Sequence, residues 1–106
     1  MPKYLWKASY TQTGAKGIVG DGGTARKAAI EELVSGAGGS VEAFYFAFGD
    51  SDVIVIADLP DETTALAISM AVNATGAVTL ETVPLLEPAQ VDAAAKQSID
   101  YRPPGG

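Results

Sequence analysis

The chain contains no cysteine and no histidine among its 106 residues. The absence of cysteine excludes disulfides, thiolate zinc sites, iron–sulfur clusters and cysteine nucleophiles. The absence of histidine removes the most common general base, the most common transition-metal ligand and the usual haem ligand. Any catalysis would therefore depend on carboxylates, tyrosine, lysine, serine or threonine, and we expect no cofactor.

Basic residues and long apolar runs are also scarce. The chain has 7 basic and 13 acidic residues, which gives a net charge of −6. Nucleic acids and anionic membranes bind basic surfaces, so we expect neither as a partner. No apolar run approaches the roughly 20 residues of a membrane span. The N-terminal residues lead directly into a strand pattern without the features of a signal peptide, and we expect a cytoplasmic protein.

The residues that are present are typical of a globular domain, with 47% hydrophobic and 19% charged side chains. A chain of this length can bury one core between two layers. Alternation of side chains with period two predicts strands at residues 3–11, 40–48, 52–59 and 77–84. Helical spacing predicts helices from about Thr24 to Gly36, from Pro60 to Gly76, and from Pro88 to about Gln97. Residues 1–97 form the predicted domain, and residues 98–106 form an irregular tail.

This order of elements is β-α-β-β-α-β with an additional C-terminal helix. It predicts a ferredoxin-like α+β fold in which a four-stranded antiparallel sheet carries its helices on one face. Residues 12–23 contain five glycines and are predicted to form a flexible loop, which could act as a lid. The loop lacks the Gly-Lys-Ser/Thr sequence of a phosphate-binding P-loop.

Both faces of the predicted sheet carry apolar side chains, although the helices cover only one face. Residues 53–56 are β-branched throughout, and so lack the polar alternation expected of a sheet with one solvated face. Exposing a whole apolar face would be unfavourable. A second copy of the chain is the simplest cover and predicts a homodimer, and the C-terminal helix folding back is the alternative. In the second strand, one face is predicted to carry Phe44, Phe46 and Phe48, and the other Val41, Ala43, Tyr45 and Ala47.

Several short motifs occur along the chain in an order and spacing that are specific when taken together. They are Tyr10-Thr11 followed by Gly14, Arg26 at the start of the first helix, Gly38-Gly39, Gly49 with Asp52, Pro60-Asp61, and Gly76 followed by Val78, Thr79 and Thr82. Over most of residues 3–83 the chain resembles the GYD-domain family. This resemblance implies a dimeric α+β barrel, and it implies no particular activity because the family has none that is settled.

The sequence departs from the family pattern at the residue after which the family is named. The usual run is Gly-x-Tyr-Asp, and here Gly49-Asp50-Ser51-Asp52 places Ser51 at the tyrosine position. Any pocket-closing or hydrogen-bonding role of that tyrosine is absent from this chain.

Arg26 and Lys16 are candidate residues for binding a small anion. Arg26 lies in the first turn of a predicted helix, where backbone N–H groups favour negative charge, and Lys16 lies in the preceding glycine-rich segment. The alternative is that Arg26 pairs with Asp50 or Asp52, or is simply exposed. Trp6 and Tyr45 are aromatic candidates for lining a small-molecule pocket, and packing in the core or in a dimer explains them equally well.

Glu81, Tyr10, Asp50 and Asp52 are the remaining candidates. Glu81 is an acidic residue in an apolar strand and would serve as a general base if it were buried, whereas an exposed Glu81 would be merely solvated. Tyr10 is a second candidate catalytic group. Asp50 and Asp52 lie two residues apart and could bind a hard cation or do acid–base chemistry, although aspartate is also favoured in tight turns for its own sake.

The leading hypothesis is a homodimeric, cofactor-free binding or regulatory module with a small pocket between helices and sheet. The first alternative is an enzyme of the cofactor-independent monooxygenase or isomerase kind. The second is a subunit that pairs with a different protein. The absence of histidine favours binding over catalysis.

Overall fold

The computed structural model describes residues 1–106 and contains four strands and four helices. The strands are β1 (Lys3–Tyr10), β2 (Ser40–Phe46), β3 (Val53–Asp58) and β4 (Val78–Leu85). The helices are α1 (Gln12–Asp21), α2 (Gly23–Gly36), α3 (Glu62–Ala74) and α4 (Pro88–Ala95). All the predicted strands and helices are present, with ends that differ by a few residues, and α1 is an additional helix.

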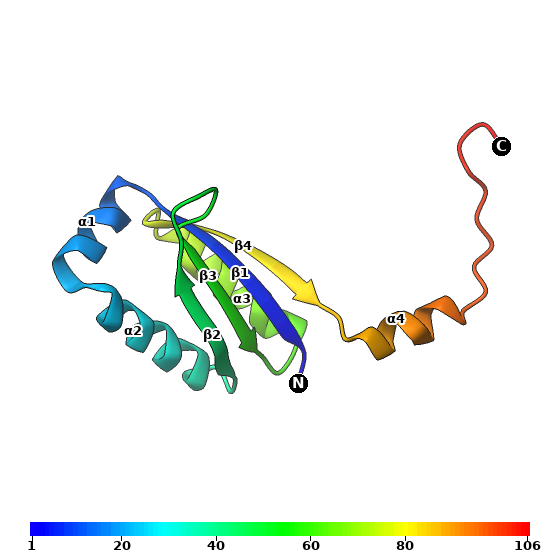
Figure 1. The fold of residues 1–106 in the computed structure, drawn as a ribbon, viewed down its shortest axis with the longest axis horizontal. Coiled ribbons are helices and arrows are strands. Elements are labelled where there is room, and N and C mark those ends of the chain that lie inside the picture. The colour runs from blue at the N-terminus through cyan, green and yellow to red at the C-terminus, as the bar shows by residue number, and fades with distance from the viewer.

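The four strands form one antiparallel sheet in the order β2-β3-β1-β4, which confirms the ferredoxin-like arrangement. Helix α2 packs at the β2 side of the sheet and α3 at the β4 side. Figure 1 shows α3 lying across the back of the sheet. No helix is long and apolar enough to cross a membrane.

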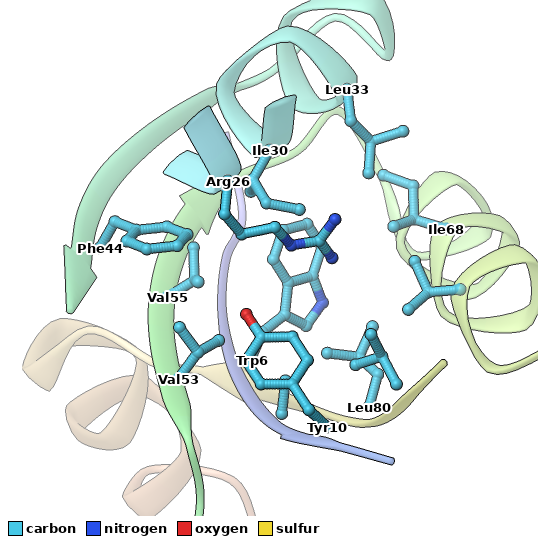
Figure 2. A pocket seen from close by; sticks show the side chains of 13 residues that line it. Trp6, Tyr10, Arg26, Ile30, Leu33, Phe44, Val53, Val55, Ile68 and Leu80 are labelled. Atoms are coloured by element: carbon cyan, nitrogen blue, oxygen red, sulfur yellow. The ribbon is translucent and has the colours of Figure 1, made fainter. Parts of the chain in front are cut away.

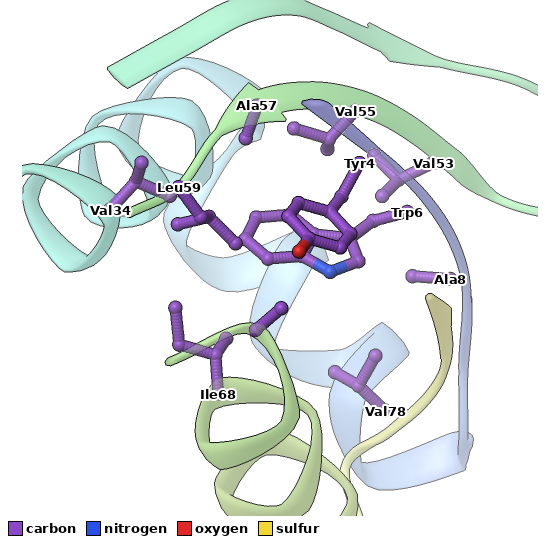
Figure 3. Packing of buried hydrophobic residues seen from close by; sticks show 11 residues of the cluster. Tyr4, Trp6, Ala8, Val34, Val53, Val55, Ala57, Leu59, Ile68 and Val78 are labelled. Carbon is purple, nitrogen blue, oxygen red and sulfur yellow. The ribbon is translucent and has the colours of Figure 1, made fainter. Parts of the chain in front are cut away.

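The core lies between the helices and one face of the sheet (Figure 3). Side chains that alternate along β1 and β3 form most of it, and Val34 from α2 and Ile68 from α3 close it from the other side. Leu59 and Val34 are the largest fully buried side chains. Only 11 of the 106 residues are buried, so the protein has a single thin core and the second sheet face contributes nothing to it.

Residues 12–21 form helix α1, and the loop predicted there is wrong. The Thr11 hydroxyl caps the helix by accepting the Gly14 N–H at 3.4 Å, and it donates to the Gly76 carbonyl at 2.9 Å. A Cβ atom at Gly14 would collide with the backbone oxygen of Ala77. Glycine is therefore needed here for close approach of α1 to the sheet and not for flexibility. Gly22, with a φ of +87°, separates α1 from α2.

A β-bulge in β2 corrects the predicted division of its side chains. The register shifts between Val41 and Ala43, so Val41 pairs with Ala57 and packs toward the helices. Ala43 and Tyr45 remain on the open face of the sheet, opposite Ile56 and Ile54. An extra residue in a bulge reverses the alternation that a period-two pattern assumes.

The strand β2 also ends at Phe46, before the Phe48 predicted to belong to it. Phe48 lies in the turn toward β3 and is fully exposed.

The C-terminal segment does not cover the open face of the sheet. Every residue from Leu86 onward is exposed, and α4 buries none of its side chains. Figure 1 shows α4 and the tail extending away from the sheet. The predicted alternative, in which the C-terminal helix folds back over the sheet, is therefore wrong for the isolated chain.

The cap of helix α3 predicts a dependence of stability on pH. The Asp61 carboxylate accepts the Thr64 N–H at 2.8 Å, and this hydrogen bond lowers the pKa of Asp61. A lowered folded-state pKa means that this stabilisation is complete above the ordinary pKa of about 4 and is lost as the pH falls through the folded-state value.

We expect Asp61→Asn to retain the cap, because asparagine caps helices as well as aspartate, and to lose the titration. The Tm of the wild type should equal that of Asp61→Asn near neutral pH and should fall below it in strong acid. Thermal unfolding followed by circular dichroism from about pH 7 to about pH 2 measures the difference. If the Tm values of the two proteins changed in parallel with pH, the assignment of this pH dependence to the Asp61 carboxylate would be contradicted.

Candidate functional site

A small apolar cavity lies between α2, α3 and the sheet (Figure 2). Its volume is about 30 Å³, and 12 of its 13 lining residues are hydrophobic. A cavity of this size has room for one or two water molecules or for a small chemical group. Arg26 is the one charged residue in its wall.

Two polar atoms in this cavity wall lack hydrogen-bond partners. They are the indole Nε1 of Trp6 and the hydroxyl of Tyr10, which are buried and make no hydrogen bond within the protein. Trp6 as a whole is only 3% exposed. An unpaired buried polar group costs about 1–3 kcal/mol. Both groups therefore favour a partner that enters the cavity, which can be a water molecule or a ligand.

Arg26 is positioned by the first turns of α2 and points toward the same space (Figure 2). It is partly buried, and the two ion pairs of the structure both belong to Lys3, so Arg26 has no acidic partner. Asp52 instead accepts the backbone N–H of Tyr10 at 2.8 Å. The predicted alternative of an Arg26 pair with Asp50 or Asp52 is thus not formed, and the guanidinium is left available to an anion.

A wider groove adjoins the cavity between α2 and α3. It has a volume of about 340 Å³ and shares Leu33, Ile68 and Val72 with the cavity wall. The small side chains of Ala67 and Ala71 form part of the α3 side of the groove. The cavity and the groove are therefore adjacent, and the side chains of these three residues belong to the walls of both.

The structure brings together three of the predicted site residues and separates the others from them. Trp6, Tyr10 and Arg26 line one cavity, because β1 directs Trp6 and Tyr10 to the face that α2 covers. Lys16 is exposed on α1 and does not line the cavity. Tyr45 is 70% exposed on the open face of the sheet.

Glu81 also lies on the open face, opposite Lys7 in the pairing of β1 with β4, and is exposed. This is the solvated arrangement that the sequence left as the alternative to a buried general base. The cavity wall contains no carboxylate.

Asp50 and Asp52 lie within the connection between β2 and β3. The backbone of Asp52 accepts the Ala47 N–H and donates to the Ala8 carbonyl, each at 2.8 Å, and its carboxylate holds the end of β1. No group of three potential metal-ligating side chains gathers anywhere in the structure. These contacts give Asp52 a structural role in fixing the backbone of Tyr10.

The model of the GYD domain matches residues 4–95. The chain belongs to the GYD domain family. The matched span includes every residue of the cavity wall and all of the sheet except Lys3, the first residue of β1. Ser51, at the tyrosine position of the family motif, lies outside the cavity wall of this GYD domain. Neither the curated proteins nor the solved structures contain a match to the chain.

Sequence reasoning placed a pocket between the helices and the sheet of this GYD domain and named Arg26, but it did not name the apolar residues that α2 and α3 contribute. Ile30 and Leu33 follow Arg26 at helical spacing and line the same cavity. That spacing was a visible signal, since residues four and seven positions apart share a helix face. The unpaired state of Trp6 and Tyr10 had no sequence signal, because it depends on which groups the folded chain places nearby.

Proposed function

We propose that this GYD domain is a homodimeric, cofactor-free binding or regulatory module of the cytoplasm that holds a small molecule between its helices and sheet. The observation that carries the proposal is the pair of unpartnered buried groups, Trp6 Nε1 and Tyr10 OH, in one apolar cavity. An apolar pocket with a few convergent polar groups is the usual form of a small-molecule site.

The composition of the cavity wall favours binding over acid–base catalysis. Tyr10 and Arg26 are its only ionisable side chains, and arginine stays protonated in proteins. Glu81, the predicted general base, lies on the opposite face of the sheet. A general base must lie within hydrogen-bond reach of the proton it removes, so Glu81 cannot serve a substrate in this cavity of the same chain.

The proposed dimer is supported by a continuous apolar row across the open face of the sheet. The row crosses all four strands in register, and its members are partly exposed. Charged groups flank it, with Lys3 paired to Asp58 at 2.9 Å on one side and Lys7 opposite Glu81 on the other. An apolar centre with a polar rim is the usual anatomy of a protein interface. The apolar row consists of Ala43, Ile56, Leu5 and Val83.

Native mass spectrometry of gently purified protein tests both parts of the proposal. We expect a dimer that carries additional mass from a bound ligand. In Tyr10→Phe, which removes a polar group of the cavity, we expect a smaller fraction of the dimer to carry this additional mass. A bare dimer would contradict a tightly bound ligand, favour a weak binder or an interaction protein, and leave the proposed dimer intact. A monomer would contradict the dimer, and copurification with a different protein would favour the role of a subunit in a mixed complex.

A further inference from the structure

The cavity wall presents hydrogen-bond donors and almost no acceptors. The indole of Trp6 and the guanidinium of Arg26 can only donate, and the Tyr10 hydroxyl can donate while also having the capacity to accept. A ligand group that only donates would leave Trp6 and Arg26 without partners. The complementary group is one with several acceptor positions, and a carboxylate has two oxygens with about four such positions.

The charge of the cavity wall restricts the class of ligand further. Arg26 has no ion pair, and the cavity has no carboxylate of its own to neutralise it. Asp21 of α1 lines a neighbouring hollow together with Arg26 and Tyr10, but it forms no ion pair with Arg26. A cationic ligand would be repelled by Arg26, whereas arginine and a carboxylate can form paired hydrogen bonds. The site therefore favours an anion over a neutral or cationic molecule.

The two volumes indicate the shape of the ligand. About 30 Å³ beside Trp6 accommodates a head group, and about 340 Å³ between α2 and α3 accommodates a longer body. Leu33, Ile68 and Val72 line both spaces. An apolar tail in the groove would be removed from water at a gain of roughly 0.8 kcal/mol for each buried methylene.

We infer that the ligand is a small carboxylic acid with an apolar tail, bound through its carboxylate by Arg26, Trp6 Nε1 and Tyr10 OH and through its tail in the groove between α2 and α3. This inference rests on the proposed small-molecule function and adds the chemical class of the ligand. It also assigns Arg26 as the residue that selects the charge of that ligand.

The single tryptophan provides a direct measurement. Trp6 is the only tryptophan of the chain, so a ¹⁵N-labelled sample gives one indole N–H signal and that signal reports on the cavity. The probes are octanoate, 1-octanol and octylammonium, which share an eight-carbon chain and differ in the head group. We expect octanoate to shift the indole signal saturably, 1-octanol to bind at least about 10-fold more weakly, and octylammonium to give no saturable shift.

Arg26→Met tests the assigned residue, because methionine keeps an apolar stem without the charge. We expect it to weaken octanoate binding about 10- to 100-fold, as the loss of hydrogen bonds to a charged group predicts, and to leave 1-octanol binding unchanged. Lys27→Met is the matched control, since Lys27 neighbours Arg26 on α2, is exposed and lies outside the cavity wall. It makes the same change in net charge and should bind octanoate as the wild type does.

The possible failures are distinguishable. Equal binding of octanoate and 1-octanol, or equal loss of octanoate binding in Arg26→Met and Lys27→Met, would overturn the carboxylate inference while the small-molecule function stands. If no probe shifts the indole signal and the purified dimer carries no additional mass, both the carboxylate inference and the small-molecule function would be contradicted. Water would then be the partner of Trp6 and Tyr10.

Discussion

Replacing Gly39 with alanine is expected to lower the free energy of unfolding by about 3 kcal/mol. Gly39 leads into β2, and a Cβ atom at this position would collide with the carbonyl oxygen of Asp58 and lie 3.1 Å from the side chain of Leu59. Asp58 belongs to the central strand β3, which is paired on both sides, and Leu59 is fully buried. Neither neighbour can move away without disturbing the sheet or the core, so the steric strain from the added Cβ atom should remain in the folded protein.

Gly36→Ala provides the matched control for this prediction. Gly36 is the last residue of α2, and a Cβ atom there would meet nothing within 4 Å. Alanine has the higher helix propensity, so this variant should be neutral or more stable by up to about 1 kcal/mol. Urea unfolding of both variants and the wild type measures the difference. Equal stabilities of Gly39→Ala and Gly36→Ala would show that the backbone beside Gly39 relaxes freely.

The strands of this protein were predictable because their side chains alternate. Tyr4, Trp6 and Ala8 on β1 are all buried, as period two requires of one strand face. Helix α1 was missed because glycine density predicts a loop, whereas Gly14 is required by the close approach of α1 to Ala77. That reason depends on a contact between residues 63 positions apart in the chain, which local patterns do not contain.

The candidate site residues could be predicted individually, but which of them lie together in the folded chain could not. Trp6, Tyr10, Arg26 and Tyr45 were all candidates, and only the fold separates Tyr45 from the others by the thickness of the sheet. The bulge in β2 contributes to this difficulty, because the face of a β2 residue relative to β1 depends on the pairing register. Which hydrogen-bonding groups lack partners depends likewise on packing that a single sequence does not specify.

A negative charge at Ile56 is expected to dissociate the proposed dimer. Ile56 lies in the apolar row, paired with Leu5 on one side and Ala43 on the other, and it remains partly exposed in the isolated chain. In a two-fold symmetric dimer the substitution Ile56→Glu occurs twice in one interface. Each copy loses about 1.5–3 kcal/mol of apolar burial, so the dissociation constant should rise by at least about 100-fold.

Sedimentation equilibrium over a range of protein concentrations measures this change. Ile99→Glu makes the same substitution in the exposed tail and should leave the dimer as stable as in the wild type. Circular dichroism should show that both variants remain folded, because Ile56 faces away from the core.

A dimer that survives Ile56→Glu would contradict an interface at the open face of the sheet. Dissociation by Ile99→Glu instead would locate the contact in the C-terminal segment, whose residues from Leu86 onward are all exposed. The cavity and the apolar row lie on opposite faces of the sheet, so Ile56→Glu changes the proposed interface without altering the cavity wall. An Ile56→Glu monomer that still binds octanoate would show that each chain contains a complete site, whereas loss of binding would make the site depend on the partner copy.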